Sequence, residues 1–244
     1  LRMADPQEEF IAATLSGDGR FVLSGGRNGG LATWDLASGE LIRTLSTTKG
    51  TVGALTASEE EAISAIALSD NDRLAMSGTR SGEVVIWDVN SGTDLRRIQL
   101  YDGVINAAAF LPDNRQIVIT AGNSNIFRLE VGTGELVYST RHQSAPINRL
   151  QTLPNADELL AGTTDGALLI INAATGEIQR TVGAHEDSIL AMDTNAEGTR
   201  ALTGSRDGSV RLWDLSPDAR RAQLIRLDGH TGSVSGVSLS EDQS

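Results

Sequence analysis

A short motif recurs along this chain at a nearly constant interval. The dipeptide Trp-Asp occurs at Trp34, Trp87 and Trp213, and two weaker copies, Leu129–Leu136 and Ile171–Ile178, fit the same frame. The five anchors fall at residues 34, 87, 129, 171 and 213, so their spacings are 53, 42, 42 and 42 residues. Equal spacing over three successive intervals indicates an internal repeat, and this constrains the fold more than any other feature.

Each repeat carries the pattern of four short β-strands. In the last complete copy, apolar and polar residues alternate with a period of two, and Asp207-Gly208 is a tight hairpin signal. The predicted strands are Ser188–Asp193, Arg200–Thr203, Ser209–Trp213 and Gln223–Leu227. The 26 glycines suit turns between such strands. Because one four-stranded sheet cannot bury both of its faces, the copies are expected to stack face to face.

One local signal competes with this frame. The stretch from Ser58 to Glu61, followed by an apolar run, has the form of a capping box that opens a helix. The repeat frame instead places Ala62–Leu68 in the first strand of the second copy. The 11 extra residues of the first spacing (53 − 42) then fall at roughly Thr47 to Ser58, and a short helical turn within that insertion is compatible with the frame.

Composition and motif content disfavour several classes of function. The chain has 32 acidic and 20 basic residues, a net charge of −12, which disfavours binding to a phosphate backbone. No apolar run approaches the roughly 18 residues of a spanning helix, so no membrane insertion is expected. There is no cysteine, the three histidines (His142, His185 and His230) lack ligand spacing, and Gly132-Thr-Gly134 reads as a turn rather than a phosphate loop. We therefore expect no metal and no cofactor.

The repeats resemble those of the WD40 family of β-propellers. Such repeats run about 40–45 residues, with Gly-His near the start and Trp-Asp near the end. The best copy runs from Gly183-Ala-His185 to Trp213-Asp214, and another begins at Gly229-His230. The resemblance implies one all-β domain over residues 1–244, with repeats at about 8–46, 62–100, 103–140, 145–182 and 185–228 and the start of a sixth at 229–244.

The same resemblance implies the architecture of the domain. It predicts five full four-stranded blades plus the first strand of a sixth, around Ser233 to Leu239. Since propellers of this family usually close seven blades, sometimes six or eight, the expectation is a truncated or partly described ring. The sequence starts at Leu1 and shows no targeting segment. Removal of a signal peptide stays open as an alternative. The compartment is undetermined by the sequence, with the cytoplasm favoured.

The family's structural tetrad can be placed residue by residue. In the fifth copy the resemblance gives His185, Thr203, Asp207 and Trp213, a hydrogen-bonded set that satisfies a buried indole and imidazole. The other copies are degenerate: Ser24, Asn28 and Trp34 in the first, Ser77, Ser81 and Trp87 in the second, Leu129 in the third, and Ala161, Asp165 and Ile171 in the fourth. By residue type, His185, Asp207 and Thr203 could also form a catalytic set. The Thr203 hydroxyl is instead expected to be hydrogen-bonded to Trp213. No catalytic residue is predicted.

A candidate partner surface follows from two repeat positions. The residue before the hairpin Asp is Arg27, Arg80 or Arg206 in three copies, and Gly122 and Thr164 in the others. A second position, near the start of each inner strand, carries Ser64, Asn106, Asn148, Leu190 and Ser235. By resemblance both lie on the top face, where arginines in an acidic protein suit a carboxylate-bearing peptide or loop. The alternatives are that hairpin tips tolerate any polar residue, and that Glu59 to Glu61 neutralise the arginines internally.

These observations lead to a function class. We expect a bacterial-type, non-catalytic scaffold that binds a protein or peptide on its top face, alone or within a larger chain or multi-subunit complex. The bacterial assignment rests on the regular Ser-Gly-Glu and Thr-Gly-Glu turns. Two alternatives stay open: a permanent structural subunit of a complex, and an enzyme with an active site in the propeller channel.

Overall fold

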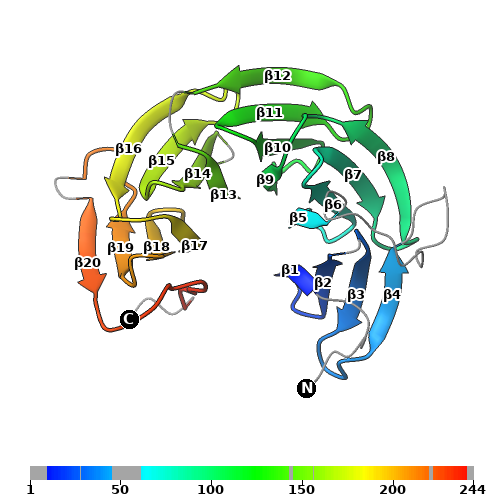
Figure 1. The fold of residues 1–244 in the computed structure, drawn as a ribbon, viewed down its shortest axis with the longest axis horizontal. Helices are drawn as coiled ribbons and strands as arrows, with labels where there is room; N and C mark the ends of the chain where they lie inside the picture. The colour runs from blue at the N-terminus through cyan, green and yellow to red at the C-terminus, as the bar shows by residue number, and fades with distance from the viewer. Residues whose placement is uncertain are drawn as a thin grey trace. The chain divides into compact units, whose positions relative to one another are not determined.

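The protein is built from β-strands. The computed structural model describes residues 10–27, 29–45, 62–142, 145–155, 157–219 and 222–240. These residues form twenty strands and no helix, arranged as five four-stranded antiparallel sheets (Figure 1). In every sheet the strands follow one another in chain order, so each sheet is a simple meander. The predicted all-β propeller architecture is confirmed.

The strand bounds repeat from sheet to sheet. The first sheet is β1 (Phe10–Leu15), β2 (Phe21–Gly26), β3 (Leu31–Asp35) and β4 (Leu41–Leu45). The second is β5 (Ile63–Leu68), β6 (Leu74–Thr79), β7 (Glu83–Asp88) and β8 (Thr93–Gln99), and the third is β9 (Ile105–Phe110), β10 (Gln116–Ala121), β11 (Asn125–Glu130) and β12 (Leu136–Arg141). The fourth is β13 (Ile147–Thr152), β14 (Glu158–Thr163), β15 (Ala167–Asn172) and β16 (Ile178–Ala184). The fifth is β17 (Ile189–Thr194), β18 (Arg200–Ser205), β19 (Val210–Asp214) and β20 (Gln223–Leu227).

The repeat frame locates these strands better than the competing local signal. All four strands predicted for the fifth copy form, within two residues at each end. The run Ala62–Leu68 forms β5 rather than a helix, and Ile63, Ala65 and Ala67 are buried on one face of that strand. Alternate burial is the period of a strand and cannot be met by a helix. Ser58 to Glu61 and the Thr47–Ser58 insertion lie outside the described residues.

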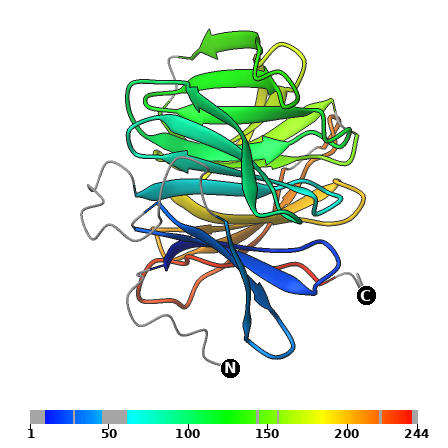
Figure 2. The ribbon, with the colours of Figure 1, turned by 90° about the vertical axis from the view of Figure 1, so that its right-hand side faces the viewer.

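The chain divides into two compact units, residues 1–122 with 128–137 and residues 123–127 with 138–244. In the first unit, β5 lies between β1 and β9, so the first strands of consecutive sheets are neighbours (Figure 1). The first sheet, drawn in blue, shows the expected strand twist from the side (Figure 2). In the second unit β13 lies beside β17.

The hydrophobic core sits between stacked sheets. In the first unit it joins the first two sheets through the buried side chains of Leu23, Leu31, Leu45, Ala75, Val85, Trp87 and Val89. In the second unit it joins the last two through Leu160, Leu168, Ile170, Val182, Ile189, Ala201 and Trp213, among others. In each unit, two neighbouring sheets thus bury apolar side chains against one another, as the repeat pattern predicts.

A glycine in the second strand of a sheet receives an aliphatic side chain of the next sheet. A Cβ added to Gly78 of β6 would lie 2.4 Å from Cγ2 of Ile105, the first residue of β9. The same arrangement recurs for Gly25 with Ile63 and for Gly162 with Ile189, both at 2.8 Å. Gly204 is packed in the same way against Val234 of the segment after β20, at 2.7 Å. Glycine is needed here for space, because real Cβ atoms do not approach other carbons this closely.

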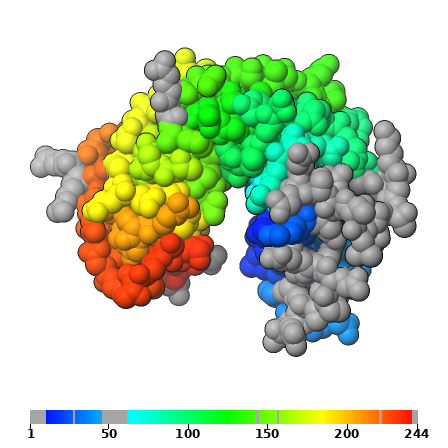
Figure 3. Space-filling model, in the orientation of Figure 1, coloured from blue at the N-terminus to red at the C-terminus, as the bar shows by residue number. Residues whose placement is uncertain are grey.

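The start of the sixth copy packs on the fifth sheet without forming a strand. The Val234 N–H donates to the Ser205 carbonyl at 2.9 Å, and the Leu239 N–H donates to Asp193 Oδ2 at 2.7 Å. Figure 3 shows this red segment against the orange sheet. The strand predicted at Ser233–Leu239 is not formed, because no second strand pairs with it anywhere in the described part of the chain.

Candidate functional site

The four side chains of the fifth-copy tetrad form one hydrogen-bonded chain. The Trp213 Nε1–H donates to Thr203 Oγ1 at 2.7 Å, and Thr203 Oγ1 lies 2.6 Å from His185 Nε2. His185 Nδ1 lies 3.2 Å from Asp207 Oδ2. These contacts are all satisfied when the imidazole is neutral with its proton on Nδ1, because Nε2 then accepts from the threonine hydroxyl. The Thr203 hydroxyl oxygen is fully buried and accepts from the Trp213 indole, so a substrate cannot reach it.

Asp207 is the most strongly bound member of this set. It accepts hydrogen bonds from the Ser209 hydroxyl (2.6 Å), the Ser209 N–H (2.8 Å) and the Glu186 N–H (2.9 Å). The buried Arg211 guanidinium lies 3.6 Å from its carboxylate. Burial favours the neutral acid, but the hydrogen bonds from Ser209 and Glu186 outweigh it and hold the pKa of Asp207 far below its ordinary value.

The pKa of His185 is shifted in the direction that keeps the imidazole neutral. Burial lowers its pKa below the ordinary value of 6.5, against the attraction of Asp207, while Arg211 and Arg226 add to the lowering. The unfolded chain therefore takes up this proton at a higher pH than the folded chain does. Protonation of His185 thus opposes folding.

This predicts how stability depends on pH. The free energy of unfolding should fall as pH drops below 6.5, the ordinary histidine pKa, because the unfolded state then binds the His185 proton first. A second fall is expected below 3.8, where the Asp207 contribution is lost. Urea unfolding of the wild type and of His185→Gln at a series of pH values checks this. The variant should lose part of the decline between neutral pH and about 5, and equal declines in the two proteins would contradict the assignment.

The degenerate copies keep parts of the same arrangement. The Trp34 indole donates to Ser24 Oγ at 2.8 Å, and the Trp87 indole donates to Ser77 Oγ at 2.9 Å. In the second copy Ser81 Oγ lies 2.9 Å from Thr79 Oγ1, and in the fourth Asp165 accepts from Thr163 at 2.5 Å. Leu129, Ala161 and Ile171 are buried where the tetrad is missing. Asn28 lies outside the described residues.

The three predicted arginines stand at hairpins. Arg27 follows β2 and Arg80 follows β6 in the first unit, and Arg206 follows β18 in the second; all three are exposed. The backbone N–H groups of Arg80 and Arg206 donate to Ala62 and Ser188, at 3.2 and 2.9 Å, which ties each hairpin to its own sheet. Their side chains are thus presented from hydrogen-bonded turns. Glu59 to Glu61 lie outside the described residues.

Four of the second set of predicted residues sit at β-bulges in the first strands of the second to fifth sheets. The ladder register shifts across Ser64, Asn148 and Leu190, and also across Asn106 in the third sheet. Ser64 Oγ donates to Ile105 O at 2.7 Å, Asn148 Nδ2 to Ile189 O at 2.9 Å, and Asn106 Nδ2 to Gly122 O at 2.8 Å. Ser64 and Asn148 thus bind the next sheet's backbone, and Ser235 is exposed in the segment after β20. The hydrogen-bond donors of Ser64, Asn106 and Asn148 are already in use.

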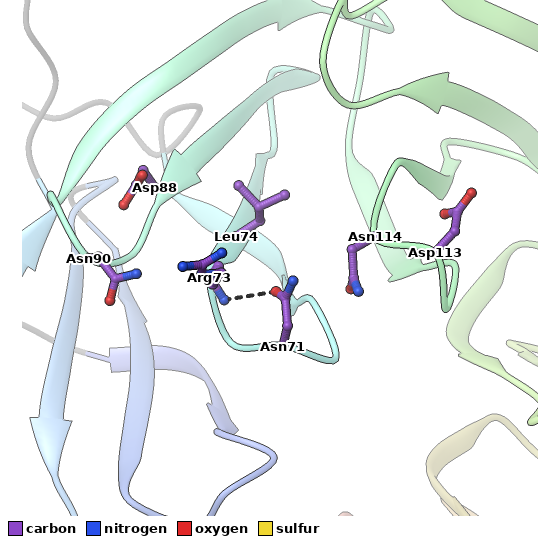
Figure 4. A pocket seen from close by; sticks show the side chains of 7 residues that line it. All are labelled: Asn71, Arg73, Leu74, Asp88, Asn90, Asp113 and Asn114. Atoms are coloured by element: carbon purple, nitrogen blue, oxygen red, sulfur yellow. Dashed lines mark hydrogen bonds between the residues drawn. The ribbon is translucent and has the colours of Figure 1, made fainter.

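Sequence reasoning missed a pair of adjoining hollows in the first unit. A polar hollow of about 420 Å³ is formed by the turns β5–β6, β7–β8 and β9–β10 and is lined by Asn71, Arg73, Asp88, Asn90 and Asp113, among others (Figure 4). A second, of about 460 Å³, shares Leu74 and Asn114 with it and adds Leu95 and Val131. These turns lie at the opposite strand ends from Arg27 and Arg80. One feature of the sequence pointed to this region of the hollows: Arg20, Arg73 and Arg115 occupy equivalent repeat positions, 53 and 42 residues apart.

Two further features of the described residues bear on other functions. No three histidine, aspartate or glutamate side chains there lie close enough together to hold a metal ion. The same residues include no helix long and apolar enough to cross a membrane.

Comparison with known proteins identifies similar repeats. The family model described as "Outer membrane protein assembly factor BamB" matches residues 57–201, more than half of the chain. Human angio-associated migratory cell protein is 26% identical over 172 residues (70% of this chain and 39% of the relative). Human striatin-4 is 22% identical over 214 residues (84% and 28%), and rat transducin beta-like protein 3 is 24% identical over 237 residues (93% and 29%). These relatives are WD40-repeat propellers. The chain spans two fifths or less of the length of each.

Proposed function

Because the chain belongs to the propeller-repeat family described as outer membrane protein assembly factor BamB, we propose that it is a non-catalytic scaffold that binds a protein or peptide partner. The partner is recognised at the hairpins that carry Arg27, Arg80 and Arg206. The observation that supports this is the placement of all three arginines, exposed, on hydrogen-bonded turns. A guanidinium held at such a turn pairs well with a carboxylate of a partner.

A charge-reversal variant tests this proposal. Affinity capture from the source cells with the wild type, followed by identification of what binds, sets the reference. Arg80→Glu combined with Arg206→Glu should reduce the captured partner by roughly tenfold or more, since each attractive contact becomes repulsive. Arg43→Glu combined with Arg141→Glu, on outer strands β4 and β12, changes the net charge equally and should leave capture unchanged. Equal capture by both double variants would refute the proposal.

A permanent structural subunit is the second candidate. Ile225 and Leu227 of β20 are 47% and 56% exposed, and Ile11 and Leu15 of β1 are 45% and 54% exposed. Aliphatic side chains this exposed suit a lasting interface. Size-exclusion chromatography of the isolated chain separates the two candidates: a stable monomer supports a transient scaffold, and aggregation that a co-purified subunit prevents supports the permanent one.

A further inference from the structure

We propose that Asp102-Gly103 is a site of covalent self-modification, at which the aspartate isomerises to isoaspartate in the folded protein. The reaction begins when the backbone nitrogen of the following residue attacks the side-chain carboxyl carbon. Glycine favours the attack, because no side chain shields its nitrogen. The chain offers five pairs of this type: Asp18-Gly19, Asp102-Gly103, Asp165-Gly166, Asp207-Gly208 and Asp228-Gly229. The proposal does not depend on the proposed function.

The reaction at Asp102 needs no reactant other than water. The Gly103 nitrogen bonds to Cγ of the protonated Asp102 carboxyl, and the N–H proton leaves with one carboxyl oxygen as water, which gives a five-membered succinimide. Water then adds to the former backbone carbonyl of Asp102 and breaks its bond to the Gly103 nitrogen. The main chain now runs through the side-chain methylene, and the former backbone carbonyl is the free carboxylate. The composition of the protein is unchanged.

Three of the five pairs are held in tight turns. The glycine N–H donates to the carbonyl three residues earlier, at 3.0 Å for Gly19 and at 3.2 Å for Gly166 and Gly208. The carboxylate that precedes each of these glycines accepts a hydrogen bond from a serine or threonine hydroxyl. Both reacting groups are therefore in use, and the turn has to open before the nitrogen can attack.

The pair Asp228-Gly229 is bound on one side. Both Asp228 carboxylate oxygens accept from Arg226 Nε, at 2.8 and 3.0 Å. No hydrogen bond holds the Gly229 N–H among the residues that the structure describes. Because the contact with Arg226 has to be released first, this pair is expected to react more slowly than Asp102-Gly103.

The pair Asp102-Gly103 is free at both reacting groups. Within the described ranges, no hydrogen bond or ion pair engages the Asp102 carboxylate, and no hydrogen bond engages the Gly103 N–H. The Asp102 side chain is exposed to water, and Gly103 has a φ of +140°, which side-chain-bearing residues rarely adopt. The attack at this pair therefore requires no opening of the fold.

The free pair lies between two anchored points of the chain. On one side the Leu100 N–H donates to the Gly82 carbonyl at 3.0 Å, and on the other the Gly122 N–H donates to the Val104 carbonyl at 2.9 Å. Isoaspartate adds one methylene group to the main chain between these anchors. One anchor then has to shift, and the first of them is part of the β6–β7 hairpin that carries Arg80.

Peptide mapping of the aged protein tests the proposal. The full chain is held at neutral pH below its melting temperature, in buffer and in parallel in guanidinium chloride, and tryptic peptides are compared over time. Isoaspartate leaves the peptide mass unchanged but alters its elution, and electron-based fragmentation locates it. Asp102, on peptide 98–115, should isomerise in the folded protein at about a third or more of its rate in the unfolded chain. Asp18, Asp165 and Asp207 should fall to about one tenth or less of their unfolded rates, because their turns must open first.

Three variants assign the signal. Asp102→Glu would have to close a six-membered ring, so the isoaspartate of peptide 98–115 should disappear. Asp102→Asn forms the same succinimide with loss of ammonia, so it should lose its amide in the folded protein. The matched control is Asp165→Asn, which is also exposed and precedes a glycine, but whose Gly166 N–H is bonded. It should lose its amide only in guanidinium chloride.

Three results would overturn the proposal. The first is protection of Asp102 in the folded protein as strong as that of Asp165. The second is an Asp102→Asn variant that keeps its amide in the folded state as long as Asp165→Asn does. The third is a signal on peptide 98–115 that persists in Asp102→Glu, which would assign it to Asp113 instead.

Discussion

Replacing Gly78 with alanine is expected to destabilise the first unit by about 3 kcal/mol, because overpacking a close sheet interface forces backbone shifts. The new Cβ would lie 2.4 Å from Ile105 Cγ2 and 2.7 Å from Ile105 Cβ, and both atoms belong to a stiff, β-branched side chain. Ile105 is fully buried and cannot swing away. Urea unfolding followed by tryptophan fluorescence measures the loss.

Two further variants make this result specific. At Gly132 an added Cβ would have no heavy atom within 4 Å, so Gly132→Ala should change stability by less than about 0.5 kcal/mol. Adding Ile105→Ala to Gly78→Ala should cost less than the sum of the single changes, since the truncated side chain vacates the space that the new methyl group needs. If Gly78→Ala is as stable as Gly132→Ala, the glycine is not the packing site described here.

The second large effect is expected at Thr203. Thr203→Ala removes the oxygen that accepts from Trp213 and lies against His185, and it leaves two buried polar groups unsatisfied. We expect a loss of about 3 kcal/mol, since each buried group without a partner costs about 1–3 kcal/mol. The melting temperature should fall accordingly, while capture of a partner by the folded protein should not change.

A conservative variant isolates the hydroxyl. Thr203→Ser keeps the oxygen and removes one methyl group, so it should cost only about 1 kcal/mol. In a Trp213→Phe background the indole N–H is gone, and Thr203→Ala should then cost less than it does in the wild type. Equal stability of Thr203→Ala and Thr203→Ser would contradict the hydrogen-bonded role. A hydrolytic activity that disappears in a folded Thr203→Ala protein would contradict the non-catalytic interpretation.

The strands were predictable because their signals are local. Period-two alternation and glycine turns act within a few residues, and the 42-residue spacing aligns weak copies with strong ones. That alignment identified β5 despite the capping-box pattern before it. The hydrogen-bonded neighbours of Trp213 followed from the family resemblance rather than from the residues alone, and the structure places all four side chains in contact.

The predicted inner-strand residues show the limit of this reasoning. Ser64 and Asn148 look like free polar groups in the sequence, but each binds a carbonyl of the following sheet, 41 residues further along the chain. The segment 233–239 alternates like a strand, yet it forms none. Both outcomes depend on whether another piece of backbone lies alongside, and no local pattern contains that information.

The repeat, the strands and the turn types are therefore determined by the sequence alone, because alternation and turn chemistry act over a few neighbouring residues. The glycine pockets for Ile63, Ile105 and Ile189, and the polar hollow beside Arg73, exist only once sheets stack. They are made by side chains from separate repeats, and their shape depends on how closely two sheets approach. Close packing fixes that distance, which is why these features emerge with the folded protein.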